Sequence, residues 1–457
     1  MSEVRNVSET LPEGYRLTEL GPLPEEWQVV RLGEVLCEVD VRVKELGGST
    51  YELPVLSLTK NDGLILQTDR FGKRIATEDV GQYKVVRRGQ IVNNPYVIWE
   101  GAVHILSKYD AGLVSPVYPV WEVKKDIAFA WFVDPLLRMP AAISAYNRFA
   151  SGAVNRRRAI RKSDFLSVPI PLPPLPEQRA IAHVLRTVQQ AKEATERVIA
   201  ALRELKKSLM RHLFTYGPVP VDQTERVPLQ ETDIGPIPEH WQVVRLGNFR
   251  KDGVIWVKNG FPQGKFNEEG HGVPHLRPFN VTDDGQISLE QIKYVSPPPE
   301  DSPYWLRKCD ILFNNTNSEE LVGKVAFVNV NGRFVLSNHM TIIRVQQPEV
   351  LDPMWVASWF LLLWQRGLTQ ALARRHVNQA SISLARLENI PIPLPPLAEQ
   401  QEIARILQAV DEKIRTEEGR KAALETLFKT LLHDLMTARR RLPTDFIARF
   451  EEESSHE

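Results

Sequence analysis

The sequence predicts an α+β protein in which a mixed α/β domain occurs twice in tandem, each copy followed by a long helix. Three observations lead to this prediction. Two sequence blocks recur at long spacing, each proline-rich block precedes a stretch with an apolar heptad pattern, and 457 residues exceed one ordinary hydrophobic core. The hydrophobic fraction of 43% and the charged fraction of 25% are typical of a folded globular chain.

Two long matched blocks carry the duplication. Residues 20–33 (LGPLPEEWQVVRLG) recur as residues 234–247 (IGPIPEHWQVVRLG), at an offset of 214. Residues 168–185 (VPIPLPPLPEQRAIAHVL) recur as residues 390–407 (IPIPLPPLAEQQEIARIL), at an offset of 222. Because chance does not produce two matched blocks of this length, the chain contains an internal repeat. The growth of the offset shows that the second copy is longer between its blocks.

The stretches between the blocks behave differently. Residues 34–150 and 248–372 align only at scattered points, such as residues 88–91 against residues 308–311. The two blocks are therefore copied, whereas the sequence between them is not. The purpose of the duplication stays open at this point, since a structural module whose interior has drifted would show the same pattern.

Short β-rich runs between Gly, Asn and Asp turns predict a mixed α/β domain in each copy. These runs are residues 28–32, 84–92, 113–123, 324–330 and 334–345. In the second copy an apolar run at residues 355–364 predicts a buried helix, with Asp352 as its N-cap and Pro353 at its first position.

Proline-rich segments and a heptad pattern of apolar residues predict the first long helix. Residues 169–176 and 391–396 are too rich in proline for a helix interior, so they predict extended connectors that end at a helix start. In the first helix only Thr195 and His212 interrupt the apolar a and d positions, and Gly217 with Pro218 ends the helix. The apolar positions are Ile181, Val184, Val188, Ala191, Val198, Leu202, Leu205 and Leu209.

The second long helix repeats the pattern less regularly. Its apolar stripe must shift to another register, toward Leu407, Ile414, Phe428 and Leu435, and the apolar pattern is weakest at residues 418–419. Each helix runs about 55 Å, and a stripe of that length must be buried. We expect an antiparallel coiled coil of the two helices, and packing of each helix on its own domain is the alternative. In the heptad register with which the second helix begins, the apolar positions are Ile403, Ile406, Val410, Leu424, Leu427 and Leu431, and Lys413, Glu417, Arg420 and Asp434 interrupt them.

These elements give the expected domain boundaries. The first α/β domain takes residues 1–170 and the first long helix residues 171–216. The second domain takes residues 217–392 and the second helix residues 393–441. Residues 442–457 form a tail.

Composition narrows the class of protein. The start of the chain lacks the pattern of a signal peptide, and the longest apolar run is half of what a bilayer requires, so we expect a cytoplasmic protein without a membrane span. The two cysteines, Cys37 and Cys309, are far apart and fit a reducing compartment. The formal net charge is zero, but residues 148–162 contain six basic residues and no acidic one. A basic patch can therefore coexist with overall neutrality.

Fragments that resemble catalytic motifs do not meet the chemical requirements of those motifs. Residues 93–96 (NNPY) resemble the base-holding loop of amino-methyltransferases, but no glycine-rich loop for a methyl donor precedes them. Residues 260–266 (GFPQGKF) resemble a P-loop with a spacer one residue short and Phe in place of the Mg²⁺-binding hydroxyl. Among the ten histidines, His271 and His275 are four residues apart but lie in loop-like surroundings without clustered carboxylates, so they do not predict a metal-ligand pair on a helix. We expect no catalytic residue, no metal site and no cofactor bound by this chain.

The remaining candidates are side chains suited to reading DNA. Arginine reads guanine edges and Asn or Gln reads adenine edges in the major groove. Both copies carry such residues shortly before the proline connector, and further candidates lie earlier in each copy. The candidates are Arg70, Lys73, Arg74, Asn93, Asn94, Tyr96, Asn155, Arg156, Arg157 and Arg158 in the first copy, with Asn314, Asn315, Asn317, Arg374, Arg375, Asn378 and Gln379 in the second.

The paired blocks, each leading into a long helix and each occurring twice, resemble those of the specificity subunits of type I restriction–modification systems. The resemblance extends from about residue 17 to residue 437. It implies two target-recognition domains that each read one half of a bipartite double-stranded DNA target, with the long helices as a ruler between them.

The resemblance also implies partners. Two methyltransferase subunits would dock on the repeated helical regions and methylate an adenine in each half-site, and restriction subunits would translocate or cut DNA. S-adenosylmethionine, ATP and Mg²⁺ would belong to those partners. Two alternatives stay open: a methyltransferase with an unrecognised donor site, and a duplicated scaffold that binds proteins.

Overall fold

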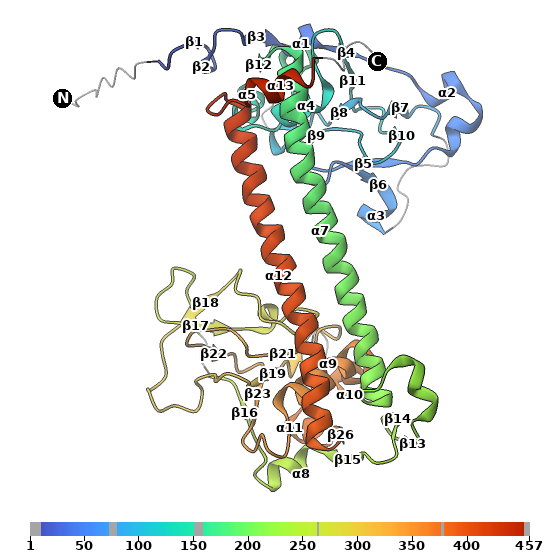
Figure 1. Cartoon of the computed structure of the whole chain (residues 1–457), viewed down its shortest axis with the longest axis vertical. Helices are drawn as coiled ribbons and strands as arrows, with labels where there is room; N and C mark the ends of the chain where they lie inside the picture. The colour runs from blue at the N-terminus through green and yellow to red at the C-terminus, as the bar shows by residue number, and fades with distance from the viewer. Residues whose placement is uncertain (1–10, 73–79, 150–158, 263–264, 376–378, 452–457) are drawn as a thin grey trace, which may run out of the picture. The chain divides into compact units, whose positions relative to one another are not determined.

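In a computed structural model the chain divides into two compact units (Figure 1). The structure describes residues 11–72, 80–149, 159–262, 265–375 and 379–451. Unit 1 consists of Met1–Ala194 with Lys421–Glu457, and unit 2 consists of Thr195–Arg420. The long helices α7 (Leu175–Tyr216) and α12 (Leu397–Met436) each contribute one part to each unit. Neither long helix is thus a domain of its own.

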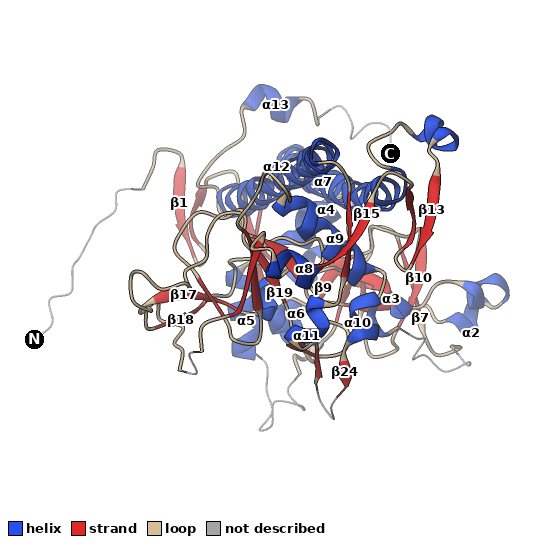
Figure 2. Ribbon diagram, turned by 90° about the horizontal axis from the view of Figure 1, so that it is seen from below, coloured by secondary structure: helices blue, strands red, loops and turns tan. Residues whose placement is uncertain are grey.

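Besides the two long helices, the described residues form short strands and short helices joined by loops (Figure 2). Besides its parts of α7 and α12, unit 1 contains β1 (Tyr15–Thr18), β2 (Gly21–Pro24), β3 (Gln28–Arg31), α1 (Leu32–Val35), β4 (Leu36–Glu38), α2 (Val43–Leu46), η1 (Gly48–Glu52), β5 (Leu56–Leu58), β6 (Leu64–Leu66), α3 (Gln67–Phe71), β7 (Lys84–Arg87), β8 (Ile91–Asn93), η2 (Ile98–Glu100), β9 (Val103–Ile105), β10 (Ala111–Val114), β11 (Val120–Val123), α4 (Ala130–Leu136), α5 (Pro140–Phe149), α6 (Lys162–Leu166), β12 (Pro169–Leu172) and α13 (Thr444–Ala448).

Unit 2 repeats much of this order. It contains η4 (Val221–Arg226), β13 (Leu229–Thr232), β14 (Gly235–Pro238), β15 (Gln242–Arg245), α8 (Leu246–Lys251), β16 (Ile255–Asn259), β17 (Val273–Leu276), η5 (Pro278–Asn280), β18 (Lys293–Val295), β19 (Ile311–Phe313), β20 (Thr316–Asn317), β21 (Val325–Phe327), β22 (Val335–Leu336), β23 (Thr341–Val345), α9 (Pro353–Gln365), α10 (Leu368–Leu372), β24 (Arg374–Arg375), β25 (Ala380–Ser381), α11 (Leu384–Glu388) and β26 (Pro391–Leu394).

A four-stranded antiparallel sheet lies at the centre of each unit. The strand order is β4-β11-β8-β9 in unit 1 and β16-β23-β19-β21 in unit 2. The two orders correspond strand by strand, although the sequences of these strands barely match. The predicted mixed α/β character is confirmed, and the divergent stretches prove to share their sheet topology as well.

The copied blocks pair with each other inside each unit. β3 lies antiparallel to β12, with Gln28 opposite Leu172, and β15 lies antiparallel to β26, with Gln242 opposite Leu394. Proline lacks a backbone donor, so the connector can form only a two-stranded edge pair of this kind. The segment expected as the first helix, 171–216, therefore begins with the end of β12, and α7 itself starts at Leu175.

A buried tryptophan and a Glu-Gln pair join the blocks to the long helices. Trp27 Nε1 donates to Glu177 Oε2 at 2.9 Å, and Trp241 Nε1 donates to Glu399 Oε2 at 3.0 Å. The neighbouring Gln178 is completely buried, where its Oε1 accepts from Phe129 N at 2.8 Å and its Nε2 donates to the carbonyl of Pro173 at 2.8 Å.

Gln400 makes the same bridge in unit 2. Its Oε1 accepts from Asp352 N at 2.8 Å, and its Nε2 donates to Pro395 O at 3.0 Å. Asp352 is the N-cap of α9, which begins at Pro353, as the sequence predicts. Each glutamine therefore ties the start of a long helix to the start of a core helix.

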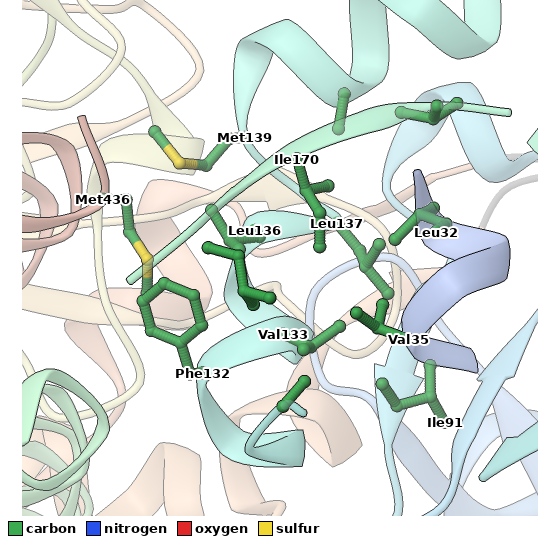
Figure 3. Close-up of a cluster of buried hydrophobic side chains, with 14 of the residues drawn as sticks. Leu32, Val35, Ile91, Phe132, Val133, Leu136, Leu137, Met139, Ile170 and Met436 are labelled. Atoms are coloured by element: carbon green, nitrogen blue, oxygen red, sulfur yellow. The ribbon is translucent and has the colours of Figure 1, made fainter. Parts of the chain in front are cut away.

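Apolar side chains pack around these hydrogen bonds and form the core of each unit. Figure 3 shows the cluster in unit 1, where Phe132 and Leu136 of α4 lie beside Met436 of α12 and Ile170 of β12. In unit 2 the indole of Trp355 stacks on Phe214 of α7, with 4.2 Å between ring centroids. The core of each unit thus includes residues from both long helices.

In unit 2 the two long helices pack in opposite directions. Arg203 pairs with Glu418 and Lys206 pairs with Asp411, at 2.7 and 2.6 Å. The residue number in α12 falls as the residue number in α7 rises, which is the antiparallel direction that the sequence predicts. In unit 1, Leu185 of α7 shares a hydrophobic cluster with Leu435 of α12.

The expected register of α7 is wrong in its second half. Val198 and Leu205 are 43% and 48% exposed, while Ile199 and Lys206 are buried. Lys206 takes an inward position because it has a carboxylate partner there, which a search for apolar residues does not detect. The shifted register predicted for α12 is confirmed at three positions, because Leu407, Ile414 and Leu435 are buried. This helix ends at Met436, before the expected 441, and Ala438 follows with a positive φ of 54°.

We predict that Gln178→Leu lowers the free energy of unfolding by about 2–4 kcal/mol, because it leaves the buried Phe129 N–H and the Pro173 carbonyl without partners. Chemical denaturation measures this loss. Gln190→Leu, at an exposed position of the same helix, is the matched control and should change stability by less than about 0.5 kcal/mol. Equal effects of the two variants would contradict the bridging role of Gln178.

Candidate nucleic-acid interface

A small three-stranded sheet gathers the candidate residues of unit 2. Its order is β20-β25-β24, with Asn317 opposite Ala380 and Arg375 opposite the same alanine on the other side. Asn317, Arg374 and Arg375 therefore lie on adjacent short strands, and Gln379 immediately precedes β25. Residues more than fifty positions apart in the sequence are brought together here.

The charged and amide groups of this sheet are accessible. Arg374, Arg375 and Gln379 are exposed, and Arg375 forms an ion pair with Glu319 at the surface. Asn317 is half-buried, and its Oδ1 accepts a hydrogen bond from Ser318 N at 2.8 Å. Exposed arginines beside amide side chains are the groups that contact phosphates and base edges of DNA.

Asn314 has a structural position instead. Its side chain is fully buried, and Nδ2 donates to the carbonyl of Leu321 at 2.9 Å. Asn314 follows the central strand β19 directly, so its side chain still faces the core. A base contact by Asn314 stays a prediction, and the structure places this side chain in the interior of unit 2. Asn315 is half-buried, with its Oδ1 at 3.2 Å from the hydroxyl of Thr341.

The corresponding loop of unit 1 follows β8. Asn93 is buried, and its Oδ1 accepts from Trp121 Nε1 at 2.7 Å, so in this structure the side chain supports the sheet. Asn94 is half-buried: Oδ1 accepts from Tyr96 N at 3.0 Å and Nδ2 donates to the hydroxyl of Tyr118 at 3.3 Å. Tyr96 is 47% exposed at the tip of the loop.

Arg70 lies on the same side of unit 1. It is exposed, donates to Leu58 O at 2.9 Å and covers the ring of Phe71. Burial raises the pKa of Tyr118, and the Arg70 charge opposes that rise. The Asn94 amide contacts the Tyr118 hydroxyl, and Asn94 in turn accepts from the Tyr96 backbone. The other candidates of this unit, and one of unit 2, lie outside the described residues: Lys73, Arg74, Asn155, Arg156, Arg157, Arg158 and Asn378.

One backbone hydrogen bond recurs in both units and positions these loops. Ile160 N donates to Pro95 O at 3.1 Å, and Ile382 N donates to Asn315 O at 2.9 Å. Ile160 and Ile382 are related by the repeat offset of 222. In each unit the loop after the central strand is therefore held against the segment that precedes the proline connector. The basic stretch 155–158 immediately precedes this tie in unit 1.

Sequence reasoning missed Tyr118 and Thr341, the two hydroxyl groups that hold these loops. Neither residue stands out in the sequence, because each is an ordinary residue beside or within a β-strand. The described residues contain no group of His, Cys, Asp or Glu suited to a metal ion. Across that same part of the chain, every helix is too short or too polar to cross a membrane.

Comparison with protein families identifies the chain. The model described as the type I restriction modification DNA specificity domain matches residues 141–204 and 238–426, which is more than half of the chain. The chain belongs to this family. Specificity subunits are the DNA-recognition subunits of type I enzymes and do not perform the chemistry themselves, so the expectation of a recognition subunit without catalytic function is confirmed.

Individual specificity subunits resemble the chain along most of its length. A Methanocaldococcus jannaschii protein described as a type I restriction enzyme MjaX specificity subunit is 27% identical over 449 residues, covering 94% of this chain and 98% of the relative. The MjaVIII specificity subunit of the same organism is 25% identical over 446 residues, covering 92% and 94%. The crystal structure of the S subunit from M. genitalium shares the fold, with a TM-score of 0.57, 14% identity and coverage of 90% of this chain and 96% of that one.

We predict that the double variant Arg374→Ala/Arg375→Ala weakens DNA binding by about 10- to 100-fold, because two charged donors to DNA are lost. The slope of log affinity against log salt should become shallower by about one for each lost phosphate contact. Titrations of the complex with its methyltransferase partner at several salt concentrations measure both quantities.

The control for this experiment removes the same charge elsewhere in unit 2. Arg226 and Lys251 are exposed and lie far from β24 in the sequence. Arg226→Ala/Lys251→Ala should leave affinity and salt slope almost unchanged. If both double variants weaken binding equally, total charge rather than the β20-β25-β24 sheet governs binding.

Proposed function

We propose that this specificity subunit reads an asymmetric bipartite DNA target, with one half-site read by each unit. The observation that carries the proposal is the repeated backbone tie at Pro95 and Asn315. Counted from this tie, Pro95 and Tyr96 in unit 1 stand where unit 2 has Asn315 and Thr316. Different side chains at equivalent positions favour two different half-sites over a palindrome.

The partners follow from the family. The chain would direct two adenine methyltransferase subunits and the restriction subunits to the target, and S-adenosylmethionine, ATP and Mg²⁺ would bind to those partners. A cytoplasmic location stays a prediction. Measured S-adenosylmethionine binding by the isolated chain would favour a methyltransferase instead, and failure to bind any duplex at low salt would favour a protein scaffold.

We also propose that the long helices set the gap between the half-sites. α7 and α12 are the covalent connections that pass from one unit to the other. Their antiparallel packing inside unit 2, with ion pairs such as Lys206 with Asp411, supports a role as a stiff connection. A connection of constant length would translate directly into a constant number of base pairs.

We predict that methylated adenines in the genome of the host fall in a two-part sequence whose halves differ. Replacing residues 34–165 with the equivalent segment of a relative should change one half-site and leave the other half and the gap as they were. Methylation mapping by sequencing tests both statements. Identical half-sites, or a replacement that alters both halves, would contradict the assignment of one half-site to each unit.

The gap is tested by lengthening both helices where the units meet along the chain. Four residues inserted between Ala194 and Thr195, with four between Arg420 and Lys421, preserve the packing inside each unit. They add about 6 Å to each helix and turn it by about 40° beyond a full turn. On B-DNA this corresponds to a gap longer by one or two base pairs.

Both half-site sequences should persist in the lengthened variant, because neither reading surface has changed. Two inserted residues per helix serve as the contrast, since they rotate the helix by about 200° and should abolish methylation. An active four-residue variant with the original gap would show that the spacing is set elsewhere.

A further inference from the structure

An exposed turn next to the β20-β25-β24 sheet is not among the residues considered so far. It joins β22 to β23 and consists of Ser337, Asn338, His339 and Met340, closed by a hydrogen bond from Met340 N to Ser337 O at 3.0 Å. Ser337 and Met340 are buried, whereas Asn338 and His339 are exposed at its tip. A turn anchored at both ends presents its two central side chains in a defined place.

The turn is attached to the candidate interface on one side. His339 O accepts a hydrogen bond from Thr316 N at 3.2 Å, and Thr316 is the first residue of β20. The next residue of that strand is Asn317, which shares a sheet with Arg374. The tip of the turn therefore lies beside the arginines and amides already described.

On its other side the turn contacts the loop after β16. Gly260 N donates to Met340 O at 2.8 Å, and Phe261 N donates to Leu336 O at 2.6 Å. A Cβ atom at Gly260 would meet Ser337 O at 2.2 Å, so only glycine permits this approach. Asn259, the last residue of β16, is exposed immediately before this glycine.

Thr341 joins the loops through its side chain. Its hydroxyl lies 3.0 Å from Asn259 Oδ1 and 3.2 Å from Asn315 Oδ1, and Thr341 itself is 2% exposed. Both oxygens are acceptors and the hydroxyl carries one hydrogen, so it donates to either of the two side-chain amides from one buried position. The β16 loop, the β22–β23 turn and the β19 loop thus form one connected surface within unit 2.

We propose that Asn338 and His339 read bases of the half-site assigned to unit 2, and that Thr341 positions the loops on which this reading depends. The inference rests on the proposed function and adds residues to it. An uncharged asparagine matches the donor and acceptor on the major-groove edge of adenine, and an imidazole offers a donor or an acceptor to a base edge. Neither tip residue carries a carboxylate that would repel DNA.

The test compares methylation maps of cells that carry the full system. With Asn338→Ala/His339→Ala, the unit 2 half-site should become degenerate at one or two positions, with discrimination there reduced roughly 5- to 150-fold, while the other half-site and the gap stay the same. Asn331→Ala/His271→Ala is the matched control. It removes an exposed Asn that precedes β22 and an exposed His that precedes β17. These two strands are parallel, and the turn Ser337–Met340 lies at the other end of β22.

Two results would overturn the proposal. One is an unchanged half-site with unchanged DNA affinity of the complex. The other is weaker binding to every sequence with a shallower salt slope, which would make the turn a phosphate contact. A wild-type map without any two-part sequence would instead overturn the proposed function, and this inference with it.

Thr341 is tested as a positioning residue. Thr341→Val keeps the shape but removes the hydroxyl, and it should relax the unit 2 half-site while the unit 1 half-site remains sharp. Thr341→Ser restores the hydroxyl and should restore the original half-site. Relaxation that serine does not rescue would assign Thr341 to packing alone and overturn its positioning role.

Discussion

The architecture depends on a Glu-Gln pair at the first turn of each long helix, in which Glu177 and both glutamines are buried and Glu399 is half-buried. A carboxylate in a core is costly unless it is paired. Glu177 meets this demand with the indole of Trp27 and the guanidinium of Arg441, whose Nε lies 2.8 Å from Glu177 Oε1. Glu399 meets it with Trp241 and with His240 at 2.8 Å. The strand blocks, the helix start and the core are therefore held by one group of hydrogen bonds in each unit, which explains why these blocks are the copied part of the sequence.

The contrast between copied blocks and divergent stretches also explains how the two units can share a scaffold and differ at their surfaces. The central sheets have the same strand order, and the tie from Ile160 or Ile382 holds the loop after the central strand in the same place. These ties use backbone atoms, so they place no demand on the side chains of the loop. Tyr96 in one unit and Thr316 in the other can therefore differ at this tie, whereas the side chains of Asn94 and Asn315 are held by the hydroxyl groups of Tyr118 and Thr341. A scaffold held by main-chain bonds is thus compatible with two unrelated reading surfaces.

The repeat, the long helices and the Asp352 cap were all predictable, because each leaves a local or periodic trace in the sequence. The shared topology of the sheets was not, since it depends on pairing between distant strands whose residues have diverged. The burial of Asn93 and Asn314 was not predictable either: they have the residue type of a base contact, but their place at the end of a central strand turns them inward. Asn317, Arg374 and Arg375 were predictable as types and clusters, while their assembly into one sheet required the structure.

Lys206 shows how a polar residue in an apolar seam links a helix to a reading unit. It pairs with Asp411 across the helices of unit 2 and also donates to the carbonyl of Asp284 at 2.8 Å. Both ions are 5% exposed, and burial raises the pKa of Asp411. Two well-packed apolar residues would hold such helices together equally well, but they would tolerate other alignments. The ion pair accepts one alignment, because a shift along the helix would leave both charges buried and unpaired. Since Asp284 belongs to the loop that follows Asn280, the alignment of the helices and the position of the unit 2 domain are set by the same ammonium group.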